Sequence, residues 1–146
     1  MDYNLEGDIV DLADNVVDNI ETAVEKLASA GAENFFISNS VDLRNVPYEI
    51  SENRLEAAEV FTLRVNEKLP AVLENLEEEL DINIIQFDHT GTTDKIVANP
   101  TRYGLKYLEI AAQPTWPEVK PVAENADDSY ILYTSEYSSI EYTFVE

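Results

Sequence analysis

Residues 27–39 read Leu-Ala-Ser-Ala-Gly-Ala-Glu-Asn-Phe-Phe-Ile-Ser-Asn, and this stretch decides the fold. Gly31 follows a periodic apolar segment, at the point where a glycine can take the left-handed conformation that ends a helix. Phe35-Phe36-Ile37 then forms a short, continuous apolar run, which is typical of a parallel strand covered on both faces of its sheet. The stretch therefore predicts a helix that ends near Ala30 and leads into a buried strand.

The segment upstream, from about Asp8 to Ala30, has the pattern of an amphipathic helix. Its apolar residues recur at the spacing of one helical face, and Asp and Glu residues lie between them. The apolar positions are Ile9, Ala13, Val16, Val17, Ile20, Val24 and Leu27.

The segment downstream begins with a loop, residues 39–47, which is rich in turn formers and ends in a proline. A second long helix is predicted from about Ser51, its candidate cap, to Glu79. Pro70 lies inside this helix and has no backbone N–H, so we expect a kink or a break there.

A second apolar run at residues 82–87 predicts another buried strand, which ends at Asp88-His89. A short helix should cover Thr92–Ala98, because the residue before Pro100 disfavours helix. The order helix–strand–helix–strand–helix predicts a single α/β domain, residues 1–146, with parallel strands and right-handed crossovers. Residues 106–146 read as a proline-rich loop and an aromatic tail, in which 130–145 form a hairpin by propensity alone.

Composition excludes several classes of protein. The 146 residues include no cysteine and a single histidine, so we expect neither a disulfide scaffold nor a zinc site built from thiolates or several histidines. The net charge of −21 repels phosphate and argues against direct nucleic-acid binding. No apolar run is long enough to span a membrane, and residues 1–6 do not resemble a signal peptide, so the compartment stays unknown.

The acidic residues are spread over the whole chain rather than collected in one block. Distributed acidity indicates a solvated surface, as in adaptation to a salty (halophilic) environment, where repulsion between carboxylates is screened. The alternative is a protein that mimics nucleic acid and occupies a basic partner.

Several motifs, in order, resemble the second half of GDSL (SGNH-type) esterases and lipases, a family of acylhydrolases. The resemblance covers residues 8–105 and implies a three-layer α/β/α, flavodoxin-like arrangement. It rests on Leu27…Gly31-Ala32, Asn39-Ser40-Val41-Asp42-Leu43, Val65-Asn66, Ile84-Ile85-Gln86-Phe87-Asp88 and Ala98-Asn99-Pro100-Thr101-Arg102-Tyr103-Gly104-Leu105.

The same resemblance implies that the catalytic positions are not retained. The block with the serine nucleophile and the glycine of the oxyanion hole have no counterpart in this sequence, and Asp2-Tyr3 is a candidate remnant of the oxyanion-hole Asn block. At the positions of the family's Asp and His stand Thr134 and Tyr137. A tyrosine, with a pKa near 10, is a poor proton acceptor at neutral pH, and a threonine supplies no anion. Whether the chain is an enzyme is left open, with the balance against it.

Other candidate sites are weak. The Asp88–His89 pair lies at a strand end, where α/β sheets place ligands, but neighbours on a strand point to opposite faces. The acidic residues Glu124, Asp127 and Asp128 lack the spacing of a calcium loop. Tail serines without a nearby base are Ser129, Ser135, Ser138 and Ser139. We therefore predict no catalytic, cofactor-binding or metal-binding residues, and no cofactor.

The function predicted from the sequence is a non-catalytic relative of a GDSL hydrolase that serves as a binding or structural subunit. Two parallel strands are too few for an independent sheet, so we expect a homo-oligomer or a protein partner to cover its edge. One alternative is part of a split or truncated esterase that hydrolyses carboxylic esters. The other alternative is the nucleic-acid mimic.

Overall fold

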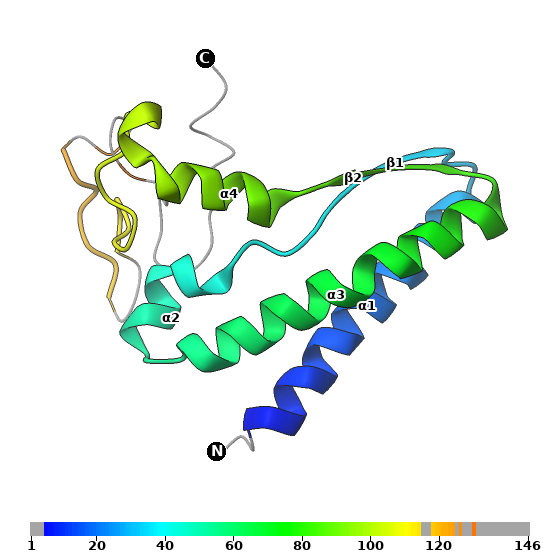
Figure 1. Cartoon of the computed structure of the whole chain (residues 1–146), viewed down its shortest axis with the longest axis horizontal. Helices are drawn as coiled ribbons and strands as arrows, with labels where there is room; N and C mark the ends of the chain where they lie inside the picture. Colours follow the sequence, from blue (N-terminus) through cyan, green and yellow to red (C-terminus); the bar gives the residue numbers. More distant parts are fainter. Residues whose placement is uncertain (1–4, 115–117, 125, 127–129, 131–146) are drawn as a thin grey trace. The chain divides into compact units, whose positions relative to one another are not determined.

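The computed structural model describes residues 5–114, 118–124, 126 and 130, and it confirms a mixed α/β fold (Figure 1). The helices and strands follow one another as α1 (Leu5–Ser29), β1 (Asn34–Ser38), the 3-10 helix η1 (Leu43–Asn45), α2 (Pro47–Ser51), α3 (Leu55–Leu80), β2 (Asn83–Phe87), α4 (His89–Ala98) and the 3-10 helix η2 (Pro100–Tyr103).

The described residues form two compact units. The first contains α1, β1, nearly all of α3 and β2, and it ends at Thr90, the second residue of α4. The second contains η1, α2 and the described residues from Gly91 onward. Among the described residues, no helix is both long enough and apolar enough to cross a membrane.

The stretch at residues 27–39 folds largely as its sequence predicts. Helix α1 ends at Ser29, and Gly31 has a φ of 100°, in the left-handed region that favours glycine. The Gly31 N–H donates to the carbonyl oxygen of Ala28 at 2.8 Å, which closes the last turn. The chain therefore leaves the helix at this point and enters β1 a few residues later.

The core of the first unit lies between α1, α3 and one face of the sheet (Figure 1). Each helix contributes one apolar stripe, because its buried residues recur every three or four positions. The buried members are Ala13, Val17 and Val24 of α1, Val65, Leu69, Leu73 and Leu76 of α3, and Ile84 of β2.

The sheet has two parallel strands, with Asn34 opposite Asn83 and Ser38 opposite Phe87. Alternate residues point to opposite faces, and one face packs on the core through Phe35, Ile37 and Ile84. The expectation of strands covered on both faces is wrong. The other face exposes Phe36 and Ile85, at 67% and 56% of their surface, because no other described element covers it.

The predicted second helix begins later than expected, at Leu55, and it is preceded by a short helix, α2, that the sequence did not predict. Ser51 is the last residue of α2 rather than the cap of α3, and Asn53, with a φ of 55°, separates the two. Asparagine tolerates this left-handed conformation better than most residues. Helix α3 then runs through Pro70 without a break, since Leu69 and Leu73 on either side are 2% and 1% exposed and anchor both halves in the core.

The second unit has a smaller core, in which Val97 and Leu108 pack against the buried Ile96 and Leu105. Next to η1, the guanidinium of Arg44 binds the carboxylate of Asp42 through hydrogen bonds of 2.7–3.0 Å.

Two effects on the pKa of Asp42 oppose each other. The residue is only 7% exposed, and burial alone raises the pKa of its carboxyl. The hydrogen bonds from Arg44 outweigh burial and lower the pKa of Asp42 below its usual value. Arg54 binds Glu49 in a similar way, and its guanidinium lies 4.7 Å from the ring centre of Tyr48. The predicted hairpin at 130–145 falls, apart from Tyr130, outside the described residues.

Replacing Leu69 by alanine should destabilise the protein by about 2–5 kcal/mol, because the substitution leaves a cavity in the core between α1 and α3. Urea unfolding followed by circular dichroism measures this free energy. The matched control is Leu63→Ala, also in α3, since Leu63 is 63% exposed and its truncation opens no cavity. Equal losses for the two variants would contradict the packing described here.

The ion pair between Asp14 of α1 and Arg64 of α3 should make stability depend on pH. The Nε and Nη2 atoms of Arg64 bind the two carboxylate oxygens of Asp14 at 2.7 and 3.0 Å, and Lys68 Nζ lies 3.1 Å from one of them. The hydrogen bonds from Arg64 lower the pKa of Asp14 to about 2; burial raises it, and the bond from Lys68 lowers it further.

The carboxyl pKa of Asp14 is lower in the folded chain than in the unfolded chain, where it is near 3.9. The stabilisation that the ion pair gives is therefore complete above about pH 4 and disappears as the pH falls towards 2. Asp14→Asn should therefore unfold at lower urea than the parent at pH 7, and the difference should shrink at pH 3. Asp18→Asn is the control, because Asp18 is 66% exposed and lies 3.9 Å from Lys68. A difference for Asp14→Asn that is independent of pH would contradict the ion pair.

Candidate functional site

The carboxyl ends of β1 and β2 meet at one edge of the sheet, the position at which α/β folds usually bind ligands. In this chain, that edge carries a hydrogen-bonded network of polar groups from the loop after β1, from α3, from the residue after β2 and from the start of α4. We call it the strand-end network, and its members are Asn39, Ser40, Asn66, Asp88, His89 (backbone only) and Thr90.

Asn39 is the centre of the strand-end network. Its side-chain oxygen accepts hydrogen bonds from the backbone N–H groups of His89 at 2.8 Å and Thr90 at 3.1 Å, so it caps the first turn of α4. Its side-chain amide donates to Asp88 Oδ1 at 3.0 Å. Two of the N–H groups that a bound anion would use are therefore already occupied by a side chain of the protein.

Asn66 joins the network from the middle of α3. Its side-chain oxygen accepts from the N–H of Ser40 at 2.8 Å, and its amide donates to the Ser40 carbonyl at 3.1 Å and to Thr90 Oγ1 at 2.8 Å. Thr90 Oγ1 also donates to the Ser40 carbonyl. The loop after β1 is thus fixed to two helices.

The polar side chains of this network are engaged in hydrogen bonds within the protein. The Ser40 hydroxyl donates to the carbonyl of Val41 at 3.0 Å, so it is not held by a proton acceptor of the kind a nucleophile requires. Asp88 binds the amide of Asn39, and His89 begins α4, with its ring centre 6.0 Å from that of Phe87. The predicted helix at 92–98 begins earlier than expected because Asn39 caps residues 89 and 90.

The exposed face of the sheet is the second notable feature of the first unit. Phe36, Ile85 and Phe87 lie on it, and the rings of Phe36 and Phe87 are stacked with their centres 5.6 Å apart. Phe87 is 37% exposed. We call these three residues the apolar face. The ten residues of β1 and β2 include no charged side chain, although 27% of the whole sequence is charged.

Of the remaining candidate residues from the sequence, some lie inside the described ranges and others lie outside them. Thr134 and Tyr137, the four tail serines and the acidic residues Asp127 and Asp128 lie outside the described residues. Glu124 is described and is exposed. Within the described residues, no three His, Cys, Asp or Glu side chains are grouped so that they could hold a metal ion.

Three members of the strand-end network stand out in the sequence, although not as members of a site. Asn39, Asn66 and Asp88 belong to the motifs that carry the family resemblance, and the structure brings them together in the strand-end network. Their hydrogen bonds join residues 24 to 51 positions apart, and no local pattern signals such pairs. No family model and no curated protein matches the chain.

Asn39→Ala should destabilise the protein by about 1–2 kcal/mol, because the first turn of α4 loses its cap. Urea unfolding measures the loss, and amide hydrogen exchange at residues 89 and 90 should show reduced protection. Asn34→Ala is the control, since the Asn34 side chain makes an exposed bond of 3.3 Å to Asn83. If Asn39→Ala cost no more than Asn34→Ala, the capping role of Asn39 would be wrong.

Proposed function

We propose that this chain is a non-catalytic binding or structural subunit, related to GDSL (SGNH-type) hydrolases, that associates through the apolar face. The observation that carries the proposal is the exposure of Phe36 and Ile85 at the centre of a parallel sheet. Parallel sheets are normally covered on both faces, so a sheet with one bare face lacks a layer.

The position of the strand-end network supports a non-catalytic role. The sheet edge at which a ligand would bind is filled by Asn39, Asn66 and Thr90, which bond to one another and to the backbone. A partner over the apolar face would complete the three-layer arrangement that the family resemblance implies.

We identify the partner as a second copy of the chain. A contact around a two-fold axis places the same patch on both subunits, and an uncharged apolar patch is complementary to itself. A basic protein would be drawn to the net charge of −21, but the strands offer it no carboxylate with which to pair. The apolar face is thus a site where two acidic copies can meet without bringing like charges into direct contact.

The size of the apolar face predicts a weak dimer. At roughly 200 Å² for each large side chain, the three residues leave roughly 300 Å² of surface in water. Two copies would bury roughly 600 Å², which is less than the roughly 1,000 Å² of a stable specific interface. Association should therefore depend on protein concentration. It should also strengthen with salt, because screening reduces the repulsion between the two charged copies.

Size-exclusion chromatography with light scattering tests this proposal on the full chain in low and high salt. We expect the average mass to rise from monomer towards dimer with concentration, and to rise at lower concentration in high salt. Phe36→Ser should keep the chain monomeric, because it removes the most exposed side chain of the apolar face.

Leu63→Ser is the matched control, since Leu63 is exposed to a similar extent on α3. It should dimerise like the parent. A chain that remains monomeric at high concentration and high salt would contradict the proposal, and so would a dimer that Phe36→Ser leaves unchanged.

A further inference from the structure

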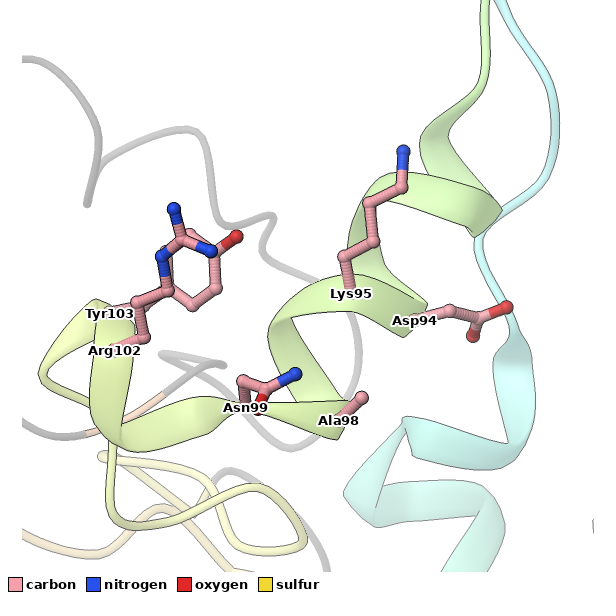
Figure 2. Close-up of a pocket in the computed structure, with 6 residues that line it drawn as sticks. All are labelled: Asp94, Lys95, Ala98, Asn99, Arg102 and Tyr103. Atoms are coloured by element: carbon pink, nitrogen blue, oxygen red, sulfur yellow. The ribbon is translucent and has the colours of Figure 1, made fainter.

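A hollow of about 360 Å³ lies in the second unit, between the last turns of α4 and the 3-10 helix η2 (Figure 2). It shares no residue with the strand-end network or with the apolar face. Its lining residues are Asp94, Lys95, Ala98, Asn99, Arg102 and Tyr103.

The arginines of this chain show why the hollow is unusual. Three of the four hold a carboxylate within the protein: Arg44 binds Asp42, Arg54 binds Glu49 and Arg64 binds Asp14. Each pair has at least two nitrogen–oxygen contacts of 3.0 Å or less. Arg102 is the exception among the described residues, since it forms no ion pair there. In a chain with 30 acidic residues, a guanidinium without such a partner is a strong candidate to bind an external anion.

The neighbours of Arg102 add to this potential. Figure 2 shows the side chains of Lys95 and Arg102 extending from the same side of the ribbon, whereas the carboxylate of Asp94 points away from both. Lys95 also forms no ion pair among the described residues. Two positive charges and the one negative charge of Asp94 thus border the hollow, which leaves a net positive charge. Asn99 contributes an amide that can donate a hydrogen bond to a bound oxygen.

The apolar part of the lining favours an organic ligand over a bare ion. Ala98 and the ring of Tyr103 offer surface that an alkyl or aromatic group can cover. The charge of the chain favours a single negative charge on the ligand, because a net charge of −21 repels a dianionic phosphate more strongly than a monoanionic carboxylate. A carboxylate is also the group that the other three arginines hold.

We propose that this hollow binds a small organic carboxylate with an apolar or aromatic body. The guanidinium of Arg102 holds the carboxylate, Lys95 and Asn99 supply a second charge and a hydrogen bond, and Ala98 with Tyr103 contacts the body of the ligand. The proposal is independent of the association through the apolar face, because the two features use different residues.

The test is a titration of the isotope-labelled full chain with benzoate, followed through the backbone amide signals by NMR. Signals of residues 94–103 should shift and saturate. Benzamide, which has the same shape without the charge, should produce much smaller shifts at equal concentration. Inorganic phosphate should bind more weakly than benzoate, whereas tighter binding of phosphate would overturn the choice of a carboxylate.

Variants separate a specific site from general charge attraction. Arg102→Gln should weaken benzoate binding by roughly tenfold or more, the usual scale for losing a hydrogen bond to a charged group, and Lys95→Gln should weaken it less. Lys26→Gln, in α1, changes the net charge equally at a residue that does not line the hollow, and should bind benzoate like the parent. Circular dichroism confirms that each variant is folded. The absence of saturable shifts at residues 94–103, or equal binding by Arg102→Gln and Lys26→Gln, would overturn the proposal.

Discussion

The parallel pairing of β1 with β2 is the constraint on which the first unit depends. A parallel pair needs a crossover between its strands, and α3 provides it while packing on α1 and on one face of the sheet. With only two strands, one layer of helices is enough to bury Phe35, Ile37 and Ile84. The same geometry necessarily turns Phe36 and Ile85 to the opposite face, where no described element meets them. The bare face therefore follows from the alternation of side chains along the two strands and from the lack of a second covering layer among the described residues.

The strand-end network fixes how the pair of strands is held. One carboxamide, that of Asn39, satisfies two N–H groups at the start of α4 and also binds Asp88, so the ends of both strands are locked together. Asn66 extends the lock to α3. In an α/β enzyme, this edge is where substrate or cofactor binds. Here the side-chain amides of Asn39 and Asn66 occupy part of this edge, and the two binding features that we propose, the apolar face and the hollow at Arg102, use other residues.

Sequence patterns predicted the local structure well and the tertiary environment poorly. The apolar period in α1, the glycine at position 31 and the two apolar runs were sufficient to place the first helix and both strands, since these signals depend on neighbours in the chain. Helix α2 was not predicted, and α3 was predicted to begin too early, because the break between them includes the left-handed conformation of Asn53.

The burial of Phe36 was predicted wrongly for a related reason. An apolar run indicates a covered strand only when enough further elements exist to cover it, and that is a property of the whole fold. The roles of Asn39 and Arg64 were also out of reach, since their partners lie about 50 residues away. The hollow at Arg102 depends on which arginines find a carboxylate in space, which sequence spacing does not reveal.

Association of two copies through the apolar face can be detected as intermolecular contacts in a mixed sample. An equal mixture of isotope-labelled and unlabelled chains at high protein concentration and high salt allows NMR to select contacts that cross between copies. We expect such contacts between the rings of Phe36 or Phe87 on one copy and the methyl groups of Ile85 on the other. Intermolecular contacts confined to other surfaces, such as Leu63 of α3, or their complete absence, would contradict the proposed association.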